Sequence, residues 1–164
     1  MAGFFGGHGF GFLFRRDEGV VSRSIWWRGT LALLAPLLAL TWVWLLIGGG
    51  AHTGFDANQA VIARTGLTYL YLLVFAAGIL LTAICQYNLS AKRFRARGRL
   101  PGLAGVLPLA ALLTGAVHWL APRMDGALPG WAVAGVDVVM LAVAVWNVVD
   151  LGVGKESRTG IEKD

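Results

Sequence analysis

Charged residues divide this chain into long apolar stretches separated by short polar segments. No Asp, Glu, Lys or Arg occurs between Arg28 and Asp56, between Arg64 and Lys92, or between Arg99 and Arg123. The stretch from Asp125 to Asp150 contains a single charged residue, Asp137. Each stretch can supply the ~20 apolar residues that a helix needs to cross about 30 Å of hydrocarbon. The pattern therefore predicts four membrane-spanning helices.

We expect the spans at roughly 30–48, 66–86, 102–121 and 128–149. Continuous apolar runs favour helices over barrel strands, in which apolar and polar residues alternate. The predicted fold class is an all-α integral membrane protein with four transmembrane helices. A Gly/Phe-rich segment covers 1–25, the membrane domain covers 26–151, and a tail covers 152–164. No cleavable signal peptide is expected, because residues 1–14 contain no Lys or Arg.

The positive charges that flank the spans predict the orientation of the chain. Short loops with an excess of Lys and Arg remain in the cytoplasm. Twelve of the 14 basic residues fall on one side of the predicted spans. They are Arg15, Arg16, Arg23, Arg28, Lys92, Arg93, Arg95, Arg97, Arg99, Lys155, Arg158 and Lys163. Arg64 and Arg123 fall on the other side. Both termini are therefore expected in the cytoplasm, and the expected location is a membrane that borders the cytoplasm.

The composition agrees with a membrane protein and excludes several function classes. The chain is 57% hydrophobic and 14% charged, whereas soluble domains carry about 25% charged residues. Because basic residues set orientation here, no nucleic-acid partner is expected. One cysteine, Cys85, excludes an internal disulfide and a thiolate metal cluster. A haem between helices usually needs two histidines, and only one falls in a span. We expect no cofactor, no metal site and no enzymatic activity, since no catalytic motif is present.

Three polar residues in the spans form a candidate intramembrane site. Asp137 lies about 13 Å into the fourth span at 1.5 Å per residue. Carboxylates at such depth usually face protein or a water-filled cavity. One interpretation is a proton or ion site made by Asp137, His118 and Asn147. The other is a neutral aspartic acid that is hydrogen-bonded to a neighbouring helix, through a residue such as His118 or Asn147.

Five cations follow the second span and form a candidate contact with anionic lipids or with a partner. They are Lys92, Arg93, Arg95, Arg97 and Arg99. Each cation near an anionic membrane surface contributes about 1 kcal/mol. The alternative is that these residues only set the topology.

The N-terminal segment is a candidate docking tail. Its first 14 residues contain five of the eight phenylalanines, interleaved with glycines. They are Phe4, Phe5, Phe10, Phe12 and Phe14. Glycine keeps such a segment flexible, and phenylalanine favours a dry surface. The tail could dock in a groove of a partner, or lie disordered against the membrane.

Small residues predict how the last two spans pack. Ala111 and Gly115 are four residues apart on the third span, and Gly130 and Ala134 are four apart on the fourth. In lipid, small residues allow helices to approach closely. A short connection makes these two spans antiparallel neighbours, so we expect the two small-residue faces to meet.

The order of these features resembles that of a family of small bacterial inner-membrane proteins, domain-of-unknown-function family 805. That family has an Arg-Ser-Arg-x-x-aromatic-Trp entry to the first helix, similar to SRSIWW at Ser22–Trp27. It also has an Arg-Arg-Leu-His-Asp-x-Gly segment after the second helix. Lys92 and Arg93 match the two arginines, and Gly98 matches the glycine.

The chain also departs from the family pattern. Arg95 and Ala96 replace the family's His and Asp, and Gly102 and Leu103 replace its Trp pair. The closing Asn-Arg-Phe-Gly pattern is absent. The resemblance covers about Val20–Leu107, and it implies a compact four-helix fold without implying an activity.

The leading hypothesis is a small non-catalytic accessory or scaffold subunit that packs against a larger inner-membrane complex. The expected partners are this complex and a bilayer with anionic phospholipids. One alternative is a small proton- or ion-coupled transporter or channel that uses Asp137. A second alternative is an anionic-lipid-binding membrane protein that works through the basic segment.

Overall fold

The computed structural model describes residues 9–16, 18–47, 59–124 and 127–154, with side chains for all of these except 47 and 59–65. Most of the described residues are helical, and none of them belongs to a strand. The long helices are α1 (Arg23–Ile47), α2 (Gln59–Ala96), α3 (Val106–Leu120) and α4 (Gly130–Asn147). Shorter helical turns are η1 (Gly11–Arg15), η3 (Pro101–Gly105), η4 (Ala121–Arg123) and η5 (Val148–Val153). Four helical segments of the described residues are long and apolar enough to cross a membrane, which confirms the expected number of helices of membrane-spanning length.

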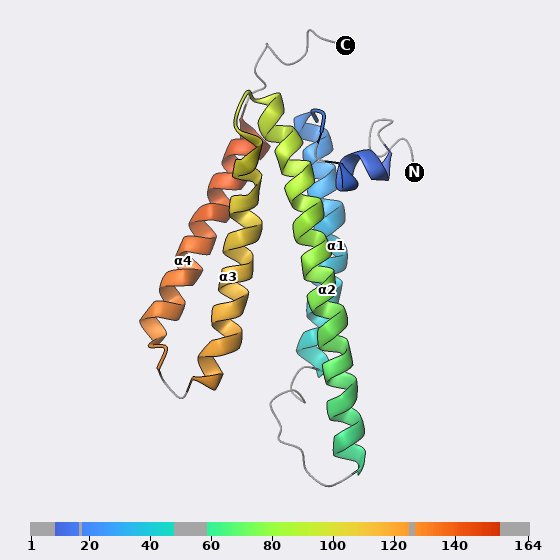
Figure 1. The fold of residues 1–164 in the computed structure, drawn as a ribbon, viewed down its shortest axis with the longest axis vertical. Helices are drawn as coiled ribbons and strands as arrows, with labels where there is room; N and C mark the ends of the chain where they lie inside the picture. The colour runs from blue at the N-terminus through green and yellow to red at the C-terminus, as the bar shows by residue number, and fades with distance from the viewer. Residues whose placement is uncertain (1–8, 17, 48–58, 125–126, 155–164) are drawn as a thin grey trace.

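The four helices form two pairs that meet at one end of the molecule and diverge toward the other (Figure 1). α1 packs along α2, and α3 packs along α4. α2 and α3 make few contacts with each other, whereas η3 packs closely on α2. We call the joined end the cap and define it as residues 11–30, 86–105 and 147–154. The cap therefore brings together the first and last described turns, η1 and η5, and the C-terminal end of α2.

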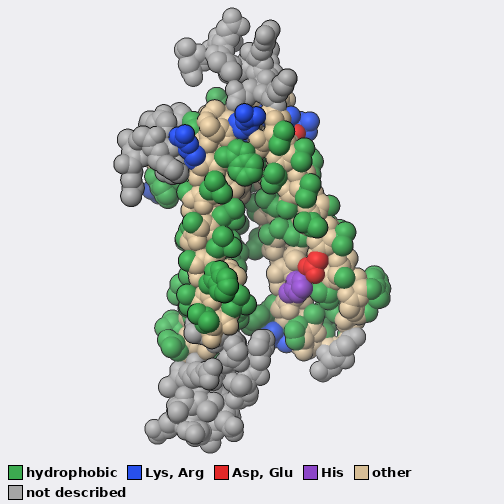
Figure 2. All heavy atoms as spheres, turned by 180° about the vertical axis from the view of Figure 1, so that it is seen from behind, with side chains coloured by type: hydrophobic (Ala, Val, Ile, Leu, Met, Phe, Trp, Pro, Cys, Tyr) green, Lys and Arg blue, Asp and Glu red, His purple; other side chains and the backbone are tan. Residues whose placement is uncertain are grey.

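The buried hydrophobic core of the described chain lies in the cap. It consists of Leu13, Phe14, Val21, Trp26, Leu89, Ala91, Phe94, Ala104 and Leu151. Below the cap, large apolar side chains cover the outside of both pairs (Figure 2). Water would make this arrangement costly, whereas lipid tails are as apolar as these side chains. The exposed spans and the buried cap fit a protein that has hydrocarbon around its long helices.

Aromatic side chains and a close glycine contact hold α1 against α2. The hydroxyl of Tyr71 donates a hydrogen bond to the carbonyl of Leu40 at 2.6 Å. The rings of Trp44, Tyr71 and Phe75 stack on one another, with centroids 5.9–6.3 Å apart. A Cβ at Gly78 would lie 3.0 Å from a methyl carbon of Leu40, so glycine allows the helices to approach here. This pair therefore forms a continuous two-helix unit.

α2 extends ten residues beyond the expected end of the second span, Gln86, and stops at Ala96. The basic segment that was expected to connect two spans is therefore mostly helical. α2 ends in a Schellman motif, in which the residue that follows the last helical residues adopts a left-handed backbone conformation. Gly98 has a φ of +67°, and its amide donates to the carbonyl of Arg95. The amide of Arg99 donates to the carbonyl of Phe94.

Candidate functional site

Lys92 on α2 anchors the first described turn, η1. Its side chain is 0% exposed. The Nζ donates hydrogen bonds to the carbonyls of Leu13 (3.3 Å) and Arg16. One turn earlier, the Asn88 amide donates to the Phe14 carbonyl at 2.7 Å. The last carbonyls of a helix have no donor within the helix, and a cation satisfies them well. Lys92 therefore caps the C-terminal end of η1.

Arg93 anchors the last described turn, η5, in a corresponding way. Its side chain is also 0% exposed. The Nε donates to the carbonyl of Leu151 at 3.1 Å, and an Nη donates to the carbonyl of Gly154 at 3.0 Å. Trp27 on α1 adds a bond from its indole to the Gly152 carbonyl at 3.2 Å. Neighbouring residues of α2 thus hold η1 and η5.

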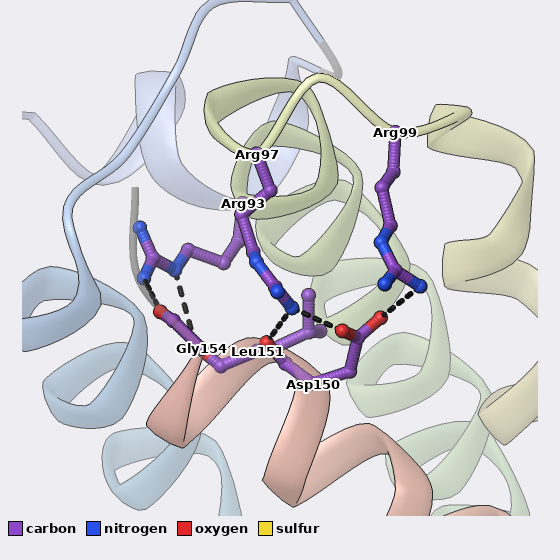
Figure 3. Close-up of polar contacts among 6 residues, drawn as sticks. All are labelled: Arg93, Arg97, Arg99, Asp150, Leu151 and Gly154. Carbon is purple, nitrogen blue, oxygen red and sulfur yellow. Dashed lines mark hydrogen bonds and ion pairs between the residues drawn. The ribbon is translucent and has the colours of Figure 1, made fainter. Parts of the chain in front are cut away.

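Two further arginines meet at the carboxylate of Asp150 (Figure 3). Arg97 forms an ion pair and a hydrogen bond with the Asp150 side chain and also donates to its backbone carbonyl. Arg99 reaches the second carboxylate oxygen at 3.0 Å. The Arg97 side chain is 15% exposed and that of Arg99 is 48% exposed. Two guanidinium groups share one carboxylate, so these three described side chains together carry one excess positive charge.

These positions correct the expectation that all five basic residues are surface contacts for lipids or a partner. The side chains of Lys92 and Arg93 are buried, and they donate hydrogen bonds to backbone carbonyls of this chain. Neither side chain therefore reaches a lipid headgroup in this structure. Arg95 and Arg97 are partly buried. Arg99 is the exposed member of the set. The sequence could not show this, because it does not reveal which helix ends lie beside the cations.

The phenylalanine-rich tail is also used within the chain. Phe14 is 2% exposed and belongs to the buried core, and Phe12 packs against that core. Phe10 is 64% exposed and lies with its ring centroid 4.8 Å from that of Phe14. Phe4 and Phe5 fall outside the described residues. The expectation of a docking tail is thus wrong for Phe14 and Phe12, which fill the cap.

His118 and Asp137 form a polar pair between α3 and α4. The His118 Nε2 lies 2.8 Å from the Asp137 Oδ1. Both side chains are about half exposed, at 52% and 48%. Figure 2 shows a histidine and an acidic side chain side by side among hydrophobic groups, well below the cap. A polar pair with an open side at this depth favours a further polar or aqueous neighbour over lipid tails.

Asn147 does not join this pair. It lies ten residues after Asp137, about 15 Å farther along the helix. Its side chain is 1% exposed, and its Nδ2 is buried without a hydrogen-bond partner in the described chain. The three-residue intramembrane site expected from the sequence is therefore reduced to His118 and Asp137.

An apolar cleft of about 460 Å³ separates α2 from α3 below the cap. Its lining includes Phe75, Ile79 and Leu80 of α2 and Ala111, Gly115 and Ala116 of α3. A Cβ added at Gly115 would meet nothing within 4 Å. α3 and α4 are neighbours as expected, but Ala111 and Gly115 face the cleft, so the expected contact of that small-residue face with α4 is wrong.

A metal site and a reactive thiol are two further candidate features of the described residues. No group of three or more His, Cys, Asp or Glu side chains that could hold a metal ion occurs among them. Cys85 is free and partly buried against the cap core. The sequence analysis missed Asp150, although a carboxylate at the end of an apolar span could have been matched to the arginines across the cap.

Comparisons with protein-family models, with curated proteins and with solved structures found no match in any of the three.

Proposed function

We propose that this chain is a non-catalytic accessory subunit of a bacterial inner-membrane complex and that it receives a transmembrane helix of its partner between α2 and α3. The observation that carries the proposal is the apolar cleft with its small-residue wall at Ala111, Gly115 and Ala116. In lipid, helices associate through close packing at small residues rather than through the hydrophobic effect. A cleft that is already open on this face favours a helix as its occupant.

The polar pair supports the same occupant. His118 follows Gly115 by three residues, so the two are neighbours on the surface of α3, with Gly115 toward the cleft and His118 toward α4. Neither His118 nor Asp137 lines the cleft, but Trp119, the residue after His118, does. A helix in the cleft would therefore pass beside this pair. A polar side chain of that helix could hydrogen-bond to the pair, and such bonds contribute about 0.6–2 kcal/mol in membranes. The partner helix is thus expected to carry a polar residue at this depth.

The proposed orientation places the cap in the cytoplasm. Nine basic residues of the described chain belong to the cap or lie directly beside it. They are Arg15, Arg16, Arg23, Arg28, Lys92, Arg93, Arg95, Arg97 and Arg99. Arg123 lies at the opposite end, on η4. Positive-inside topology then gives cytoplasmic ends for all four helices that meet the cap. The resemblance to domain-of-unknown-function family 805 is part of this proposal and adds no activity to it.

The test compares two glycine-to-leucine variants in native membranes. Gly115→Leu fills the cleft, and Gly135→Leu adds the same side chain on α4, where an added Cβ also meets nothing within 4 Å. The chain is purified in mild detergent, and co-purifying proteins are quantified by mass spectrometry. We expect a stoichiometric partner that Gly115→Leu reduces about tenfold, since overpacking costs about 1–3 kcal/mol. Gly135→Leu should retain the partner. A chain that purifies alone, or equal losses in both variants, would contradict the proposal.

A second function is favoured by the 2.8 Å contact between His118 and Asp137. A histidine–carboxylate pair inside a membrane can bind and release a proton, as in the relays of pumps and transporters. In this alternative, reconstituted chain carries a proton or ion flux, and Asp137→Asn abolishes it. If the chain is an accessory subunit, neither the wild type nor Asp137→Asn shows a flux, and Asp137→Asn keeps its partner.

A further inference from the structure

A groove of about 850 Å³ runs along α4 and η5, and it joins a basic end to an apolar length. Arg97, Arg99 and Asp150 line its cap end. Apolar side chains line the rest, from Val149 to Val138. No lining residue is shared with the α2–α3 cleft. The groove is therefore a separate surface with two chemically different ends.

The dimensions of the apolar part match one leaflet of a bilayer. Val138 and Val149 are 11 residues apart, which is about 16 Å along a helix. Half of a hydrocarbon core of about 30 Å is ~15 Å. An acyl chain that begins at the cap end would follow the groove to about the middle of the membrane. Ala142 lies halfway along this path and leaves room for the chain.

The charge at the cap end selects the headgroup. Asp150 neutralises one of the two arginines beside it, so one positive charge remains. Arg99 carries it toward the outside, because its side chain is 48% exposed while one Nη is held 3.0 Å from Asp150. A guanidinium has five N–H donors, and its planar fork suits a phosphate. The Schellman turn at Gly98 fixes the direction in which Arg99 leaves α2.

We propose that this groove is a binding site for an anionic phospholipid, with the phosphate on Arg99 and one acyl chain along Val149–Val138. Basic pockets beside transmembrane helices at the cytoplasmic surface suit anionic headgroups. A zwitterionic lipid brings its own cation, which the excess charge at Arg99 disfavours. A soluble phosphate would use the basic end and leave the apolar length empty. This site does not depend on a partner in the α2–α3 cleft.

The test measures lipid adducts of the full chain by native mass spectrometry in mild detergent. The probes are phosphatidylglycerol and phosphatidylcholine, titrated separately. We expect preferential binding of phosphatidylglycerol, and about fivefold weaker binding in Arg99→Gln, the effect of one cation near an anionic surface. Arg15→Gln, which removes an exposed cation of η1, should bind as the wild type does. Ala142→Phe should weaken binding without changing charge.

Four results would overturn the proposal. Equal binding of the two lipids would mean that the site does not select an anionic headgroup. Equal losses in Arg99→Gln and Arg15→Gln would mean that the general positive charge of the chain, and not Arg99, attracts the headgroup. Unchanged binding in Ala142→Phe would mean that the acyl chain lies elsewhere. Full competition by inorganic phosphate would mean that the site takes a soluble anion. Arg99→Lys is the control for folding, because it retains the charge and should retain most of the preference for phosphatidylglycerol. Loss of binding in both Arg99→Lys and Arg99→Gln would indicate that substitution at this position disturbs the fold.

Discussion

Replacement of Arg93 by methionine tests the claim that buried cations hold the cap together. The Arg93 side chain is 0% exposed and donates to the carbonyls of Leu151 and Gly154 at 3.1 and 3.0 Å. Arg93→Met keeps an unbranched side chain that can pack like the arginine stem, and it removes both donors. The two carbonyls at the end of η5 then lose these bonds.

The expected cost follows from these two bonds. A hydrogen bond donated by a charged group contributes about 1.5–3 kcal/mol, and a buried polar group left unpaired costs about 1–3 kcal/mol. The variant no longer has to bury a charged guanidinium, and the saved desolvation cost offsets part of this loss. We expect a net loss of about 3 kcal/mol in the free energy of opening the cap. Since ~1.4 kcal/mol is a factor of ten, the cap should open about 100-fold more often.

The single cysteine provides the assay. Cys85 is partly buried and packs against the cap core, so its reaction with a maleimide reports opening of the cap. When the cap closes faster than the reagent reacts, the labelling rate follows the population of the open form. Arg93→Met should label about 100-fold faster than wild type. Arg15→Met, at an exposed position of η1, should stay within about twofold. A change below about threefold in Arg93→Met, or equal changes in both variants, would refute the reasoning.

Three further substitutions test the packing, and all are read out by the same labelling rate or by unfolding in detergent. Gly152→Ala places a Cβ 2.7 Å from the Trp27 ring and should lose about 1–3 kcal/mol, whereas Gly135→Ala, in open space, should change stability by less than about 1 kcal/mol. Equal effects of the two would contradict the contact at Trp27. Tyr71→Phe removes a 2.6 Å bond to α1 and should cost about 1 kcal/mol, and an unchanged stability would mean that the bond contributes nothing. Asn147→Leu replaces a buried amide whose nitrogen has no partner in the described chain, so it should leave stability unchanged or raise it by about 1 kcal/mol. A loss above 1 kcal/mol would show that the amide has a partner beyond the described residues.

The four spans could be predicted because lipid imposes one requirement on every residue of a span, and an uncharged run of about 20 residues meets it. The end of α2 could not be predicted in the same way. A polar, basic run such as Lys92–Arg97 is compatible with an exposed loop and with a helix, and in the structure it is helical as far as Ala96. Its burial depends on the carbonyl groups at the ends of η1 and η5, which are 58–79 residues distant in sequence. Local pattern contains no information about such neighbours.

The candidate site was predicted in part. His118 was among the residues that could bond to Asp137, and the structure brings these two together at 2.8 Å. Asn147 was grouped with them because all three are polar residues in spans, but ten residues separate it from Asp137 along one helix. Ala111 and Gly115 show a related limit. Their spacing indicates that one face of α3 permits close approach, and it does not indicate which helix will use that face.

Site-specific photo-crosslinking in native membranes tests the central claim most directly. A photoreactive residue is placed at Ala116, which lines the α2–α3 cleft, and, as the control, at Leu73 of α2, which is 69% exposed outside the cleft. The account predicts a crosslink from position 116 to one membrane protein, absent from position 73 and lost when Gly115→Leu fills the cleft. Crosslinks to lipid alone from position 116, or the same protein captured equally from both positions, would contradict it.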